Sequence, residues 1–336
     1  RALYDGEDRF PAVSIGFVAH EGALIPVERG PLASDDDVPS LWQPVVGTGA
    51  YWSEPGDDGW TRASFPVDLI EPYFNQVRNC LGTFVLRDGT VSDTWIQCGQ
   101  ETADLADEQL GDLRARLPAT FIPFSDDPSP IVEAHLATER LPVRPLADWD
   151  VDGELGAWFD QARTTHAPTS IGAVYDDGVL YVHPAATRHG PHPFPDALHH
   201  GVYSVTKSLA GALALLWAAE RYGDDVFDAR ITDHVPVLAD RPGWAGVTFA
   251  HTLDMATGTR GGEATDLLFE PLVLAETADE ALANIAALGD APEAPGEVFA
   301  YATTATFVLS AALQHYVEQR EGPGSYWDRV REEVLE

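Results

Sequence analysis

Lysine is almost absent from this sequence of 336 residues: Lys207 is the only one, and the other Lys/Arg positions are all arginine. The 20 basic residues stand against 54 acidic ones, which gives a net charge of −34. A surface this acidic repels nucleic acid and anionic lipid, so we expect neither nucleic acid nor a membrane as a partner. Such a surface favours solubility and is typical of salt-adapted proteins.

The one position that retains lysine is informative. Arginine stays protonated in any protein environment, whereas a lysine can lose its proton where its surroundings disfavour the charge. A chain that uses arginine everywhere else keeps lysine at position 207, where arginine could not do the same work. This pattern predicts that Lys207 exchanges a proton in the chemistry of the protein.

The sequence also lacks any apolar run near the roughly 20 residues that a membrane-spanning helix needs. It begins at Arg1 without a signal-peptide pattern, and we expect a mature or trimmed form.

Zinc signatures are missing, although five of the eleven histidines fall between His183 and His200. The aspartates at 35–37 fit a solvated loop better than a set of metal ligands. We expect no metal and no cofactor, with a metal hydrolase as the weaker alternative.

Cysteine occurs only twice, at positions 80 and 98. The segment between them predicts a hairpin with its turn at Arg87–Thr90. In a three-residue loop centred on Gly89, Cys80 and Cys98 would each lie nine residues away and would face one another. This would permit a cross-strand disulfide and a secreted or periplasmic location. The alternative is a pair of buried free thiols in a cytoplasmic protein.

The predicted secondary structure divides the chain into two parts. Residues 1–140 hold short β-prone runs between Gly, Pro and Asp clusters, with helical character only over Thr102–Leu117, and predict a β-rich accessory domain. A proline-rich linker follows. In residues 150–336 a second hairpin, Ser170–Val182, precedes helices interrupted by loops, which predicts an α+β domain.

The most apolar helix is predicted over Ser204–Tyr222, with Gly223 as its C-cap. Ser204 and Lys207 are three residues apart and lie on one face at its start. Apolar residues on nearly every side predict a helix buried all round, and burial beside the positive end of a helix favours a neutral amine. Neutral Lys207 could then take the Ser204 proton, as in acyl transfer. The alternative makes Ser204 a helix cap and Lys207 a surface side chain.

The motif Ser-Val-Thr-Lys-Ser-Leu at 204–209, with the Ala/Leu-rich helix behind it, resembles the class C β-lactamase, DD-peptidase and family VIII carboxylesterase group. Residues 249–258 are similar to that family's helix ending in His-Thr-Ser-Gly, and residues 295–303 to its Tyr-x-Asn segment. The resemblance covers residues 150–336. It implies a β-lactamase/DD-peptidase-like fold, with helices on an antiparallel sheet plus a helical subdomain.

The resemblance also implies roles for single residues. Tyr301 would lie beside Ser204 and Lys207 and act as general base and then as general acid; the alternative is a core tyrosine. Thr303 stands where the family has an asparagine that orients the amide carbonyl of the substrate, and a hydroxyl cannot offer the same pair of contacts. This departure favours a carboxylesterase over an amidase, β-lactamase or D-peptidase of the same family.

The family's third motif should lie well downstream of Tyr301, on an edge strand that supplies an oxyanion-hole N–H. The sequence ends at Glu336 without it, so we expect a domain incomplete at its C-terminus and a separate C-terminal chain as a candidate partner. The sequence thus predicts a serine hydrolase that forms an acyl-enzyme with a small ester or amide. The alternative from another class is a non-catalytic binding protein with the same fold.

Overall fold

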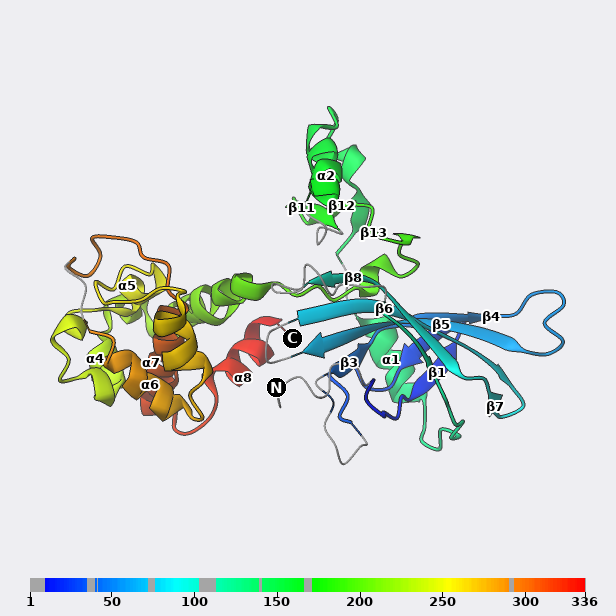
Figure 1. Cartoon of the computed structure of the whole chain (residues 1–336), viewed down its shortest axis with the longest axis horizontal. Coiled ribbons are helices and arrows are strands. Elements are labelled where there is room, and N and C mark those ends of the chain that lie inside the picture. Colours follow the sequence, from blue (N-terminus) through cyan, green and yellow to red (C-terminus); the bar gives the residue numbers. More distant parts are fainter. Residues whose placement is uncertain are drawn as a thin grey trace. The chain divides into compact units, whose positions relative to one another are not determined.

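The computed structural model describes residues 10–34, 40, 42–71, 76–102, 113–138, 141–165, 171–289 and 293–335. The aspartates at 35–37 lie outside the described residues. The chain divides into two compact units, residues 1–201 and 202–336. All of the described strands lie in the first unit and most of the described helices in the second, so the chain has an α+β fold (Figure 1).

A nine-stranded sheet makes up most of the first unit, in the order β1-β2-β4-β5-β6-β8-β9, with β3 on β5 and β7 on β6. Every pairing in it is antiparallel, and β5 (Thr61–Glu71) and β6 (Gln76–Arg87) form its long central pair. The other strands are β1 (Phe17–His20), β2 (Ala23–Pro26), β3 (Gln43–Val46), β4 (Gly49–Trp52), β7 (Thr90–Val91), β8 (Thr94–Thr102) and β9 (Arg114–Leu117).

One face of this sheet carries the apolar core of the first unit. Phe65, Val67 and Leu69 alternate along β5 and are almost fully buried there. Gly82 pairs with Phe65 on the neighbouring strand, and a Cβ at Gly82 would overlap the Phe65 ring. The glycine therefore makes room for the buried ring of Phe65.

The predicted three-residue loop around Gly89 is wrong. Asp88 and Gly89 both have positive φ, at 49° and 74°, and form a two-residue turn of the kind that matches the twist of a hairpin. Ser92 still pairs with Val85: its N–H donates to the Val85 carbonyl at 2.9 Å and its hydroxyl accepts the Val85 N–H at 3.0 Å. Between Ser92 and Trp95 the pairing then slips by one residue. Because of this slip Cys80 faces Cys98, and a disulfide joins them.

The helix predicted over Thr102–Leu117 is wrong at both of its ends. Thr102 ends β8, and Arg114–Leu117 is β9, which pairs with the start of β8; residues 103–112 lie outside the described residues. The helical pattern is a weak local preference, and pairing with a strand distant in sequence overrides it.

Removing the disulfide is expected to destabilise the first unit. A cross-link between residues 18 apart restricts the unfolded chain, so the double change Cys80→Ser/Cys98→Ser should lower the free energy of unfolding by about 2–4 kcal/mol. Urea unfolding followed by tryptophan fluorescence measures the change. Wild-type protein in reducing buffer is the matched control and should unfold with the variant; a variant as stable as the oxidised wild type would contradict the expectation.

The rest of the first unit contains a three-stranded sheet. The hairpin predicted over Ser170–Val182 is confirmed as β11 (Gly172–Asp176) and β12 (Val179–His183), joined by a turn at Asp177 and Gly178 with φ of 45° and 80°. Ser170 itself lies outside the described residues. The accompanying elements are α1 (Ser129–Ala137), β10 (Val143–Pro145), which pairs parallel to β12, α2 (Glu154–Thr165), and the short pair β13 (Ala186–Thr187) and β14 (Gly190–Pro191).

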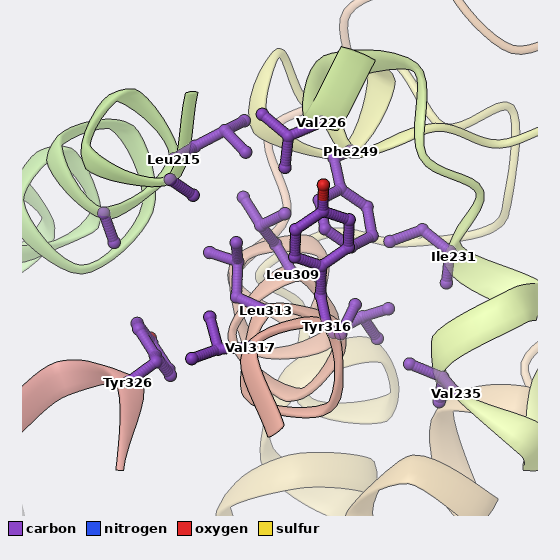
Figure 2. Packing of buried hydrophobic residues seen from close by; sticks show 14 of the residues in the cluster. Leu215, Val226, Ile231, Val235, Phe249, Leu309, Leu313, Tyr316, Val317 and Tyr326 are labelled. Atoms are coloured by element: carbon purple, nitrogen blue, oxygen red, sulfur yellow. The ribbon is translucent and has the colours of Figure 1, made fainter. Parts of the chain in front are cut away.

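The second unit packs its helices around α7 (Thr303–Glu321). Figure 2 shows α7 side chains such as Leu309, Leu313 and Val317 facing Leu215 and Phe249, and all five are fully buried. The surrounding helices are α3 (Ala214–Tyr222), α4 (Ile231–His234), α5 (Phe249–Leu253), α6 (Ala278–Ala286) and α8 (Tyr326–Val330). None of the helices in the described ranges has the length and apolar character needed to cross a bilayer.

Candidate active site

The backbone bends sharply just before Ser204. Tyr203 has a positive φ of 41°, a left-handed conformation that is costly for a bulky residue. Helical turns begin here as a 3₁₀ turn over Tyr203–Val205, pass through π-helical turns at Ser208–Leu213 and continue as α3. The bend leaves the Ser204 side chain exposed at the open start of the helix.

Ser204 and Lys207 are in direct contact. Lys207 Nζ donates a hydrogen bond to Ser204 Oγ at 2.8 Å, as the spacing of one helical turn allows. The predicted C-cap is confirmed: Gly223 ends α3 with φ of 99°. A serine oxygen held by a lysine amine can act as a nucleophile when a proton acceptor is close by.

Tyr301 lies at the same place. Lys207 Nζ is 5.1 Å from the centre of the Tyr301 ring, and the Tyr301 side chain is 40% exposed. Hydrogen bonding from Ser204, and then from Lys207, lowers the pKa of Tyr301 from its ordinary value. The structure therefore brings a hydroxyl, an amine and a phenol together, and the phenol is the group whose pKa is lowered.

Tyr301 is held in place by contacts between two segments, 249–258 and 295–303. Each of them was identified in the sequence as similar to a family motif. Ala300 N donates to the Met255 carbonyl at 2.8 Å, and Ala302 N lies 3.5 Å from Met255 Sδ, so both neighbours of Tyr301 rest on one residue that follows α5. Gly296 N donates to the Ala256 carbonyl at 2.7 Å. The two segments thus pair over several residues and fix the backbone on which Tyr301 stands.

Thr303 begins α7 and is bound by a residue that sequence reasoning missed. Glu263 accepts the Thr303 N–H at 2.7 Å through Oε1 and the Thr303 hydroxyl at 3.0 Å through Oε2. Glu263 belongs to the loop after α5, and no local motif distinguishes it from the other acidic residues of the chain.

The prediction that the nucleophile helix is buried all round is wrong. Val205 is 61% exposed, Leu209 42% and Leu216 58%, whereas Ala214 and Leu215 on the other side are fully buried. The side toward α7 packs into the core of the second unit, and no described element of that unit covers the opposite side. Apolar composition alone indicated burial but could not tell which side of the helix is covered.

The histidine-rich segment 183–200 has a structural contact of its own. Asp68 is fully buried in β5 and accepts hydrogen bonds from Asn79 Nδ2 at 2.6 Å, from the His199 N–H at 3.2 Å and from His199 Nδ1 at 2.7 Å. The hydrogen bond to Asp68 raises the pKa of His199. Across the described ranges, no group of three or more His, Cys, Asp or Glu side chains is placed to hold a metal ion.

Comparison with protein families places this chain. The family model described as Beta-lactamase matches residues 155–336, more than half of the 336 residues. The chain therefore belongs to the beta-lactamase family of serine hydrolases. The match begins in α2 and includes Ser204, Lys207 and Tyr301. A search of curated proteins finds no match to the chain.

Proposed function

We propose that this protein hydrolyses small carboxylic esters through an acyl-enzyme on Ser204. The observation that carries the proposal is the 2.8 Å contact between Lys207 Nζ and Ser204 Oγ, with the centre of the Tyr301 ring 5.1 Å from the same Nζ. One nucleophile and a pair of groups able to hold its proton are sufficient for acyl transfer without a cofactor.

In the first half-reaction, Ser204 Oγ attacks the carbonyl carbon of the ester. Its proton passes to the phenol oxygen of Tyr301, which accepts it as the phenolate beside Lys207; the hydrogen bonding from Ser204 and Lys207 that lowers the pKa of Tyr301 favours this form. The proton then passes to the alkoxy oxygen as the C–O bond breaks. An alcohol leaves, and the acyl group stays on Ser204.

In the second half-reaction, water attacks the acyl carbon. The same phenolate takes a proton from the water, and the bond to Ser204 Oγ breaks as a proton returns to that oxygen. The carboxylic acid leaves, and Ser204, Lys207 and Tyr301 regain their starting protonation. One water molecule is consumed, and no other reactant is needed.

An ester is favoured over an amide by the state of Thr303. The Thr303 hydroxyl donates its hydrogen to Glu263, so it offers a substrate only the remaining lone pairs of its oxygen. It is therefore not free to donate to an amide carbonyl as an asparagine side chain would. An amidase, a β-lactamase or a D-peptidase of the same family remains the alternative.

The proposed compartment is oxidising. The Cys80–Cys98 disulfide supports a secreted or periplasmic protein, since disulfides are rare in the cytosol of most organisms.

A matched substrate pair tests the proposal: p-nitrophenyl butyrate and the p-nitroanilide of the same acid, assayed in moderate and in high salt. We expect turnover of the ester and slower or no turnover of the anilide. Labelling with a fluorophosphonate, followed by mass spectrometry, should place the adduct on Ser204. A protein that neither turns over the ester nor takes the label would support the binding-protein alternative.

A further inference from the structure

Glu263 contacts Thr303, two residues from Tyr301, and is not itself one of the Ser204–Lys207–Tyr301 group. It sits in the glycine-rich loop after α5, forty residues before the segment that it binds. Both of its carboxylate oxygens are used there, one by the Thr303 N–H at 2.7 Å and one by the Thr303 hydroxyl at 3.0 Å.

The contact supplies what the start of α7 lacks. The N-cap residue of this 19-residue helix is Ala302, which makes no side-chain capping bond, and the first turn of the helix contains no acidic residue. The first N–H groups of a helix have no partner within it, and a carboxylate placed there both accepts a hydrogen bond and complements the positive end of the helix. Glu263 provides this cap from outside the helix.

The loop also approaches the site segment closely. A Cβ at Gly261 would lie 2.9 Å from the Ala302 Cβ, so the loop can pass at this distance because position 261 is glycine. Tyr301 is thereby flanked on one side by Ala300, bound to Met255, and on the other by Thr303, bound to Glu263. Both backbone anchors lie within two residues of the phenol.

We propose that Glu263 is a positioning residue that fixes the Tyr301–Thr303 segment and so holds the Tyr301 phenol beside Ser204 and Lys207. The inference rests on the proposed function, because it gives Glu263 a role in the proton transfer from Ser204. The negative charge of Glu263 counteracts the hydrogen bonds from Ser204 and Lys207 that lower the pKa of Tyr301. Its removal should therefore lower that pKa further.

The test compares Glu263→Gln, Glu263→Ala and wild type. Glutamine keeps one acceptor oxygen and loses the charge, whereas alanine loses both. We expect kcat for ester hydrolysis to fall about 10-fold in the glutamine variant and about 100-fold in the alanine variant, with KM little changed, because a small displacement of a catalytic group acts mainly on the chemical step. The acidic limb of the pH profile should move to lower pH in the glutamine variant.

Glu280→Gln is the matched control. Glu280 is an exposed glutamate in the same unit, its carboxylate accepts the Glu276 N–H at 2.9 Å near the start of α6, and it is not part of the site. Its replacement should leave kcat and the pH profile as in wild type. The rate of fluorophosphonate labelling of Ser204 as a function of pH gives a second readout that needs no turnover.

The outcomes separate the two proposals. If wild-type Ser204 is labelled and both Glu263 variants match wild type in rate and pH dependence, the role of Glu263 is overturned and the proposed function stands. If wild-type Ser204 is not labelled, both are overturned. A loss of rate without any shift of the acidic limb would also overturn the claim that the charge of Glu263 acts on the pKa of Tyr301.

Discussion

Ser204→Ala should lower ester hydrolysis by about 10⁴-fold or more, to a rate near that of the uncatalysed reaction in buffer. The alanine lacks the oxygen that forms the acyl-enzyme, and loss of a nucleophile removes a step that its partners cannot perform alone. The expected signature is a fall in kcat together with complete loss of fluorophosphonate labelling. Initial rates with p-nitrophenyl butyrate and intact-protein mass spectrometry measure the two effects.

Ser208→Ala is the matched control for this change. Ser208 is an exposed serine one turn further along the same helix, and Lys207 Nζ donates to Ser204 rather than to it. Its replacement should leave activity within about twofold of wild type, because the hydrogen bond between Lys207 and Ser204 does not involve Ser208. Retention of more than one hundredth of the wild-type rate by Ser204→Ala, at unchanged thermal stability, would exclude Ser204 as the nucleophile.

The local part of the site could be predicted from the sequence. Ser204 and Lys207 are three residues apart on one helix, so the regular geometry of the backbone brings them together without help from distant residues. Their catalytic roles remain predictions. The prediction that Tyr301 lies beside Ser204 depended on a resemblance to known proteins. Nearly a hundred residues separate Tyr301 from Ser204, and no periodicity in the sequence links them.

The contact of Glu263 with the site segment could not be predicted from the sequence. Glu263 and Thr303 are 40 residues apart in the sequence, and their contact joins a loop to the start of a helix. No local sequence pattern near either residue therefore predicts the contact. In a chain with 54 acidic residues, one more glutamate after a glycine pair carries no signal. A structure was needed to show that this carboxylate supplies the cap that Ala302 cannot.

The errors in the fold have the same origin. The sequence identified the hairpin between Cys80 and Cys98, but not that its register shifts by one residue between Ser92 and Trp95. It gave helical character to Thr102–Leu117, where Arg114–Leu117 pairs with β8 instead. In each case a contact across the sheet outweighed a local preference, and such contacts are invisible to a pattern read along one segment.

Lys207→Arg and Lys207→Met should each lower kcat by at least about 10²-fold, within the range that acid–base groups contribute. Arginine keeps a positive charge but stays protonated and spreads its donors over a planar group, so it cannot share a proton with Tyr301 as a lysine amine can. Methionine loses the charge as well, and its effect should be the larger. Initial rates with p-nitrophenyl butyrate measure both.

The composition of the chain provides a test of this residue without mutation. Lys207 is the only lysine, so an amine-selective acylating reagent has just one side-chain target besides the terminal amine. Acylation at Lys207 removes the charge and should abolish activity in proportion to the fraction modified, as counted by peptide mass spectrometry. Fully modified protein that retained the wild-type rate would show that the amine takes no part in the reaction.

The pH profile should show how Lys207 acts. Hydrogen bonding from Ser204, and then the hydrogen bond and charge of Lys207, hold the pKa of Tyr301 below the ordinary value, so Lys207→Met should raise that pKa. Fewer phenolate groups are then present at a given pH, and the acidic limb of kcat should move to higher pH, opposite to the shift expected for Glu263→Gln. Lys207→Arg retains the charge and should move the limb less. Opposite shifts from the two charges beside one phenol would identify Tyr301 as the group that titrates, whereas an unmoved limb in both variants would assign the titration to a different residue.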